Sequence, residues 1–358
     1  MPPPPPGHTP LPLSQEPARI VHLDYLRGLA ALSVMLFHFD KWSTTSWDAN
    51  TFLGKCGVYA VSVFFVLSGL TLSIVYAGKL GAAPGAWLAF WRARFFRIFP
   101  LLWLATLATL LLEESPYPMG HILLNVSGLF GFVSAADDIA LGAWSIGDEL
   151  VYYAAFPLLW WLASIWRPVF FLLFACSACL LGVYAFSWTH TGATVTDQWP
   201  VYVQAPNHAF FFLGGMAIAL LREGWSDVAP GVWKKIIALG LLCFWWYGPG
   251  EDPAYLISGI HRVLLSGLVL ALTAAWLMAR PQLPAGPDRV FRWLGEISYS
   301  LYLLHPLVYR CLKALDARFL GGTQTGLVWV AVFATLVLSH ISYRMLEKPV
   351  MDWARRRG

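Results

Sequence analysis

The first long apolar run of the chain carries two ionisable side chains, Arg27 and His38. Their spacing is close to three helical turns, so both side chains lie on one helix face, about 16 Å apart along its axis. An ionisable residue at the centre of a membrane helix costs about 2.5–3.5 kcal/mol on insertion and is therefore usually kept for a function. Two of them on one face predict a reaction path along this helix.

A histidine paired with a carboxylate is the usual general base for acyl transfer to a hydroxyl group. Imidazole titrates near neutral pH, and the carboxylate fixes its tautomer. His38 and Glu149 are the candidates for such a catalytic pair. The alternative interpretation is structural: His38 bonds a neighbouring helix, and Glu149 anchors the start of its own helix.

Three arginines, Arg92, Arg94 and Arg97, lie within a single stretch of six residues. Guanidinium groups make bidentate contacts with phosphates, so this stretch is a candidate site for a nucleotide-bearing donor such as coenzyme A. The alternative is plain anchoring of a helix end by positive charge. Arg27 either pairs with Asp24, one helical turn earlier, or reaches toward the same donor.

The composition is 58% hydrophobic and only 12% charged, against about 25% charged residues in ordinary soluble domains. It predicts a membrane protein in contact with lipid. No basic and aromatic surface typical of nucleic-acid binding is present, so nucleic acid is excluded as a partner. The five cysteines match neither a disulfide framework nor a zinc pattern, and we expect no metal site.

Apolar stretches long enough to span a bilayer predict an all-α polytopic membrane protein with about ten transmembrane helices. They lie near 23–42, 57–77, 97–113, 148–166, 168–187, 206–222, 232–248, 256–279, 294–315 and 325–346. The range 120–134 is apolar but short, which indicates a re-entrant or interfacial piece.

Loop charge predicts the orientation. If the N-terminus is cytoplasmic, 17 Lys and Arg residues fall in inside segments and only five fall outside: Lys41, Lys55, Arg310, Lys313 and Arg318. This asymmetry favours both termini in the cytoplasm. Residues 1–19 form a Pro-rich, disordered cytoplasmic tail, 20–350 a single transmembrane domain, and 351–358 a basic cytoplasmic tail.

With this orientation, Asp24 and Arg27 lie near the cytoplasmic boundary, and His38 and Glu149 near the outer one. Five further residues are candidates for an outward-facing acceptor cavity: His208, His261, Arg262, Tyr302 and His305. Ser68 lacks the strand-turn-helix setting of a nucleophile elbow, so we assign it a supporting role in close helix packing.

Taken together, these segments resemble the membrane-bound acyltransferase-3 family, which O-acylates surface polysaccharides and related acceptors. The resemblance covers nearly the whole chain and rests on six segments in the family's order. They are Leu23-Asp-Tyr-Leu-Arg27 with the spacing to His38, Val63-Phe-Phe-Val-Leu-Ser-Gly69, Arg92 to Pro100, Trp144-Ser-Ile-Gly-Asp-Glu149, Ile297-Ser-Tyr-Ser-Leu-Tyr-Leu-Leu-His305, and Tyr343-Arg-Met-Leu-Glu347-Lys-Pro349.

The chain departs from this pattern at three positions. Leu150 and Val151 stand where many members carry Glu and Gln, and Ser62 occupies a position that is often acidic. The sequence ends at residue 358 without the hydrolase-like domain fused to some members. We therefore expect the chain to complete the transfer alone or to hand the acyl group to a separate extracytoplasmic protein.

The resemblance implies an acyl-CoA donor, acetyl-CoA by default, in the cytoplasm and a glycan or glycoside acceptor outside a bacterial inner membrane. The donor phosphates rest on Arg92, Arg94 and Arg97, the thioester passes Arg27, and His38 acts as base or briefly carries the acyl group itself. No other cofactor is expected.

Two other function classes compete with the acyltransferase. In a transporter or flippase, the embedded ions would move a substrate without chemistry, but we find none of the internal repeats typical of transporters. In a membrane scaffold for a glycan assembly complex, there is no reason to bury Arg27 and His38.

Overall fold

The structure is a computed structural model that describes residues 20–44, 47–80, 84–113, 115–319 and 326–356. Within these ranges the chain is helical and contains no strand, so the all-α prediction is confirmed. A helix occupies each of the ten predicted apolar ranges: α1 (Val21–Ser43), α2 (Phe52–Val75), α3 (Pro84–Leu112), α6 (Trp144–Ile165), α7 (Arg167–Val183), α9 (Ala205–Leu221), α10 (Pro230–Trp246), α11 (Gly259–Ala279), α12 (Ala285–Phe319) and α13 (Leu327–Ser342).

Five helical stretches are long and apolar enough to cross a membrane: Phe52–Val75, Gly85–Leu112, Arg167–Trp188, Gly259–Ala279 and Leu327–Arg356. They make the chain an integral membrane protein. The other long helices are less apolar or shorter. α9 and α10 have 17 residues each, and α1, α6 and α12 carry charged side chains within apolar sequence.

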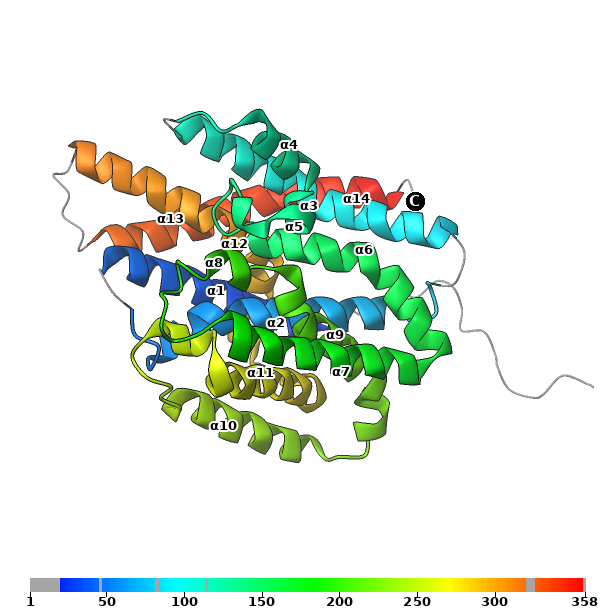
Figure 1. Cartoon of the computed structure of the whole chain (residues 1–358). Coiled ribbons are helices and arrows are strands. Elements are labelled where there is room, and N and C mark those ends of the chain that lie inside the picture. The colour runs from blue at the N-terminus through cyan, green and yellow to red at the C-terminus, as the bar shows by residue number, and fades with distance from the viewer. Residues whose placement is uncertain (1–19, 45–46, 81–83, 114, 320–325, 357–358) are drawn as a thin grey trace, which may run out of the picture.

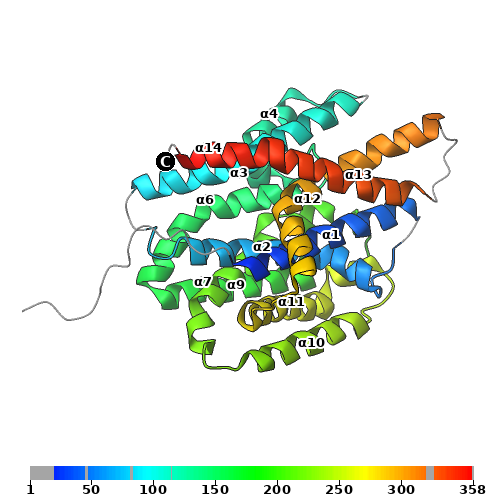
Figure 2. The same cartoon turned by 180° about the vertical axis from the view of Figure 1, so that it is seen from behind.

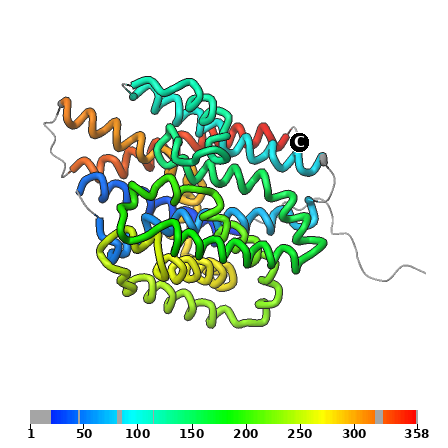
Figure 3. Tube along the Cα trace, viewed as in Figure 1, coloured from blue at the N-terminus to red at the C-terminus, as the bar shows by residue number. Residues whose placement is uncertain are grey.

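The long helices are mostly stacked side by side (Figure 1). α1 and α2 lie in the middle, α10 and α11 at one edge, and α3, α13 and α14 (Lys348–Arg356) at the other. Seen from behind, α12 lies in front of the stack beside α1 (Figure 2). The tube in Figure 3 follows the same path from the blue N-terminal helix to the red C-terminal one.

Glycine allows α1 and α12 to run parallel in close contact. A Cβ atom at Gly28 would lie 2.7 Å from the Cβ of Leu294, and one at Gly295 would collide with the backbone of Asp24. Ten residues farther along, His38 of α1 meets His305 of α12. Small residues at such a contact let helix backbones approach closely.

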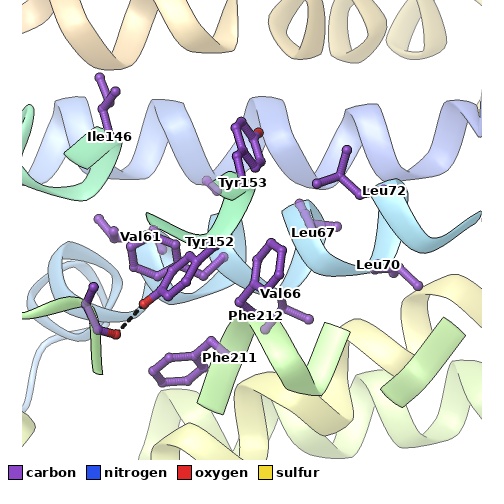
Figure 4. Packing of buried hydrophobic residues seen from close by; sticks show 14 of the residues in the cluster. Val61, Val66, Leu67, Leu70, Leu72, Ile146, Tyr152, Tyr153, Phe211 and Phe212 are labelled. Carbon is purple, nitrogen blue, oxygen red and sulfur yellow. Dashed lines mark hydrogen bonds between the residues drawn. The ribbon is translucent and has the colours of Figure 1, made fainter. Parts of the chain in front are cut away.

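The core between α2, α6 and α9 is built in the same way. A Cβ atom at Gly69 would collide with the carbonyl oxygen of Phe212, and one at Gly215 with that of Val66. Figure 4 shows the aromatic and aliphatic side chains that fill the space around this crossing, including Tyr152 and Phe212, whose rings stack 4.9 Å apart.

The range 120–134 forms a hairpin of two short helices, α4 (Met119–Ser127) and α5 (Phe130–Val133). Trp103 Nε1 donates a hydrogen bond of 2.8 Å to the carbonyl of Val126, and Gly128, at φ 74°, turns the chain against Phe99 and Leu150. Because Phe99 lies near the middle of α3, the hairpin reaches the middle of the bundle. The re-entrant and the interfacial interpretations of this range both stay predictions.

The two predicted tails have different outcomes. Residues 1–19 lie outside the described residues. The segment predicted as a basic tail at 351–358 instead continues as helix α14 through Arg356. Ala354 is buried, and the ring of Trp353 packs at 5.2 Å on Phe96 of α3, so apolar packing holds this segment against the bundle.

The glycine crossing gives a stability prediction. Gly215→Leu should force α2 and α9 apart, because the new side chain would collide with the backbone of α2. The free energy of unfolding should fall by at least the upper end of the ~1–3 kcal/mol typical of overpacking. The measurement is thermal unfolding in detergent. Gly267→Leu is the matched control, since a Cβ atom there meets nothing within 4 Å. Equal melting temperatures for the two variants would contradict the prediction.

Candidate active site

His38 and His305 form a hydrogen-bonded histidine pair. His38 Nδ1 lies 2.7 Å from His305 Nε2, with the ring centroids 5.0 Å apart and the ring planes within 12°. His305 Nδ1 lies 3.1 Å from the carbonyl oxygen of Leu301. A carbonyl only accepts, so this nitrogen carries a proton, and the Nε2 of neutral His305 accepts from His38 Nδ1–H. His38 therefore keeps a free lone pair on Nε2.

The imidazole of His38 is held from the side as well. The indole of Trp42, one turn farther along α1, stacks on it with centroids 4.9 Å apart and planes within 7°. His305 is buried, whereas His38 retains partial exposure. The ring is thus fixed in plane and tautomer and can still be reached. Trp42 was not predicted, although its spacing of four residues places it on the face of His38.

A second cluster lies around Glu149 and comprises Glu149, Ser68, Tyr153 and Arg27. Ser68 Oγ and Tyr153 OH both donate hydrogen bonds to Glu149 Oε1, and these two hydroxyl oxygens lie 3.2 Å apart. Arg27 lies within electrostatic reach of Glu149, Tyr153 and Asp24. Tyr153 was not predicted, although it lies on the same helix face as Glu149, four residues later.

The predicted pair of His38 and Glu149 is not formed. The hydrogen bonds of Glu149 go to Ser68 and Tyr153, whereas His38 bonds His305. α2 runs antiparallel to α1, with Gly57 against Phe37. Ser68, three turns past Gly57, therefore lies at the level of Arg27, about 16 Å from His38.

The depth predicted for Glu149 is therefore wrong as well. The prediction assumed that α6 begins at the outer boundary after a long external loop. Instead, the α4–α5 hairpin brings the chain into the bundle, where Gly131 packs directly on Gly147. Asp138 Oδ2 accepts a hydrogen bond of 3.1 Å from the amide of Trp144, the first residue of α6. Glu149, five residues later, lies inside the protein.

The three arginines of α3 face different surroundings. Arg92 and Arg94 line a groove of about 690 Å³ between α3, α6 and the α4–α5 hairpin, together with Trp91 and Tyr153. The guanidinium of Arg94 also lies over the rings of Phe90 and Tyr153, at 5.9 and 5.8 Å from their centroids. We call this space the arginine groove.

Arg97 points to a different neighbour. Its Nη1 lies 3.3 Å from Glu347 Oε2, and its guanidinium lies 5.5 Å from the ring centroid of Tyr299. Ser300 donates a hydrogen bond to the same carboxylate. Arg97 is therefore already paired within the protein. The predicted set of three donor arginines divides into two that open on the groove and one that joins α3 to the C-terminal segment.

The predicted acceptor residues fall in three places. Tyr302 lies beside the histidine pair, its hydroxyl 2.7 Å from Ser145 Oγ, and His305 belongs to the pair itself. His208 and Arg262 are buried deeper, both against Tyr202: His208 Nε2 bonds the Tyr202 carbonyl at 2.9 Å, and Arg262 lies 5.3 Å from the ring centroid.

His261 is separate from these groups and bonds the hydroxyl of Tyr247 at 2.6 Å. Asp148, which the sequence analysis did not assign, is fully buried. Neither of its carboxylate oxygens has a hydrogen-bond partner among the described residues, and the same holds for His208 Nδ1 and Arg262 Nε. Buried polar atoms are normally satisfied, so these groups indicate that water or a ligand enters this layer.

The geometry defines two stations, at Arg27 and at His38, along α1. Arg27 and Glu149 of α6 form a charged station beside the arginine groove, and His38 presents a lone pair about three turns away. All three side chains retain partial exposure within the bundle. This arrangement suits a substrate whose anionic end is held in the arginine groove, which passes the charged station and reacts at a nucleophile or base at His38.

Comparisons with known proteins match this chain to acyltransferases over most of its length. The family model described as an acyltransferase domain matches residues 20–344. The peptidoglycan O-acetyltransferase OatA of Listeria monocytogenes is 26% identical over 92% of this chain and 55% of its own length. The acyltransferase MdmB of Streptomyces mycarofaciens is 27% identical over 95% of each chain. Nodulation protein 10 of Rhizobium leguminosarum bv. viciae is 25% identical over 92% and 93%. No solved structure matches significantly.

The tautomer of His38 can be measured directly. In protein with ¹⁵N-labelled histidine, His38 Nε2 should show the chemical shift of a nitrogen with a lone pair, and Nδ1 that of an N–H group. His305→Ala removes the acceptor and should give mixed tautomers, whereas His305→Gln, whose amide oxygen accepts, should preserve the single one. His38→Ala assigns the signal. An unchanged His38 signal in His305→Ala would contradict the assignment.

Proposed function

Since the chain belongs to the membrane-bound acyltransferase-3 family and is thus an O-acyltransferase, we propose that it moves an acyl group from acyl-CoA in the cytoplasm to a hydroxyl group outside. Acetyl is the simplest acyl group, and a glycan or glycoside is the acceptor. The observation that carries this proposal is the hydrogen-bonded pair of His305 and the partly exposed His38, about 16 Å from the charged station.

The donor enters from the arginine side. Arg92 and Arg94 border a groove large enough for part of a nucleotide, and guanidinium groups suit its phosphates. The loop-charge asymmetry of the sequence supports a cytoplasmic position for this side. From there the thioester arm passes Arg27 and Glu149. Arg97, paired with Glu347, supports the groove wall.

In the transfer, one proton moves through His38, and a C–O bond to the acceptor replaces the C–S bond to coenzyme A. His38 Nε2 takes the proton of the acceptor hydroxyl, whose oxygen attacks the thioester carbonyl. The C–S bond breaks, and the departing thiolate of CoA takes the proton back from His38. In the covalent variant, the same lone pair attacks the thioester carbonyl, the C–S bond breaks and the CoA thiolate departs. The acceptor oxygen then displaces the imidazole from the acyl group, and the hydroxyl proton goes to the thiolate. Mass spectrometry of enzyme quenched with donor alone distinguishes the two, since only the covalent route leaves an acyl group on His38.

The acceptor meets the other end of the path. Tyr302 packs against His305 and bonds Ser145, and we place the acceptor beside the partly exposed His38 at this end. Peptidoglycan is named for the Listeria relative, and a cell-envelope glycan is accordingly the acceptor class we propose here. The relatives named above are bacterial, which supports a place in a bacterial inner membrane.

Loss of the base gives the main test. His38→Ala should lower acylation by about 100-fold or more, the usual contribution of a general acid-base group, while coenzyme A still binds. His190→Ala, an exposed histidine on a loop, is the control. The measurement is mass spectrometry of extracellular glycans. Full acylation by folded His38→Ala would refute the catalytic role. Absence of acylated glycan with wild-type protein, together with movement of an unmodified substrate, would favour the transporter.

The donor site has a separate test. Arg92→Ala and Arg94→Ala should each weaken the binding of coenzyme A by about tenfold, the value of one charge-assisted hydrogen bond. Calorimetric titration of the detergent-solubilised protein measures this change. Arg289→Ala, an exposed arginine remote from the groove in sequence, controls for net charge. Unchanged affinity in both groove variants would refute this placement of the donor.

A further inference from the structure

A second cavity, of about 460 Å³, lies on the C-terminal segment and is lined by Arg344, Lys348, Pro349, Asp352, Trp353 and Arg356. We call it the C-terminal hollow. It lies away from the arginine groove: the groove is lined by Arg92 and Phe95 of α3, whereas Phe96, next along α3, contacts Trp353 of the hollow. The proposed mechanism does not use it.

Three cations converge on this hollow with little compensation. The side chains of Arg344, Lys348 and Arg356 are exposed. Among the described residues, they form no ion pair and no hydrogen bond. The single acid, Asp352, lies 3.9 Å from Arg355, which is outside the hollow. Three cations thus line the hollow with a single carboxylate, which gives it a net positive charge and suits it to an anionic ligand.

Helix length places the hollow at the membrane surface. The continuous helical stretch Leu327–Arg356 has 30 residues and is therefore about 45 Å long. The hydrocarbon core is only about 30 Å thick, with headgroup layers on either side. A helix that enters the core near residue 327 leaves it about twenty residues later, just after Arg344. The remaining turns lie among lipid headgroups.

An apolar strip leads along the helix to the hollow. Leu338, Ile341 and Met345 are 45%, 43% and 76% exposed, and Trp353 is 46% exposed beside the cations. A soluble anion would bind the cations without contacting this strip. A lipid would place its acyl chains along the strip and its phosphate among the cations. Tryptophan is typical of this interfacial level.

We propose that the C-terminal hollow binds the headgroup of an anionic phospholipid whose acyl chains lie along the exposed face of α13. Glu347, which pairs with Arg97, lies in the sequence between Arg344 and Lys348. A bound lipid thus holds the turn that ties the C-terminal segment to α3. This proposal differs from plain anchoring of the helix end by positive charge, because anchoring would not give saturable binding of lipid.

The test measures lipid retention by the intact protein. Full-length protein is reconstituted in bilayer nanodiscs of phosphatidylcholine with or without phosphatidylglycerol, and retained lipid is counted by native mass spectrometry. Wild type should keep phosphatidylglycerol in a saturable, one-to-one manner. Arg344→Gln/Lys348→Gln should bind it about 10- to 30-fold more weakly, from the loss of two cations near the headgroup. Lys348→Gln alone should weaken the binding of phosphatidylglycerol by an intermediate factor. It replaces the double variant in the test if that variant is unstable.

Arg355→Gln is the matched control because it removes a nearby exposed cation that does not line the hollow. Retention in this control should equal that of wild type. Three results would overturn the proposal: equal retention in the double variant, equal retention of phosphatidylcholine, or displacement of the lipid by free coenzyme A. The last result would assign the hollow to a nucleotide.

Discussion

The close parallel approach of α1 to α12 fixes both stations of the site. Gly28 and Gly295 remove the side chains that would separate the two helices near the charged station. Farther along, the same approach brings His38 within hydrogen-bond distance of His305. A larger side chain at either glycine would displace the whole α12 helix. The tautomer of His38 therefore depends on packing more than two helical turns away.

The charged groups are neutralised at one level of the bundle, and the histidine pair lies at another. Glu149 accepts from two hydroxyl groups and lies within reach of Arg27. Glu347 accepts from Ser300 and pairs with Arg97. Removing one partner of a buried ion pair costs several kcal/mol, because the other charge stays buried. The two carboxylates thus lower the free-energy cost of burying the arginines at this level. The histidines, by contrast, pair as neutral rings.

The hydropathy of the sequence predicted the helices well, because the burial of apolar side chains determines them locally. Each of the ten predicted ranges coincides with a helix, and the short range 120–134 forms α4 and α5. The partner of His38 was predicted wrongly, since it depends on the axial shift between helices. Gly131 on Gly147 draws the start of α6 into the bundle, and no pattern within α6 itself reveals that depth. His305 was identified as polar and near the cavity, but its contact with His38 required the parallel packing.

The separation of the two stations limits which donor can react. A compact donor such as an acyl phosphate carries its anionic group next to its acyl carbon, so a phosphate held by Arg92 would keep the reacting carbon far from His38. A donor held at the arginine groove must therefore carry its acyl group on a long, narrow arm. Coenzyme A has this form, with phosphates at one end and the thioester at the other. The half-buried Arg27 and Glu149 then line the path of the arm, where their polar atoms can bond its amide groups.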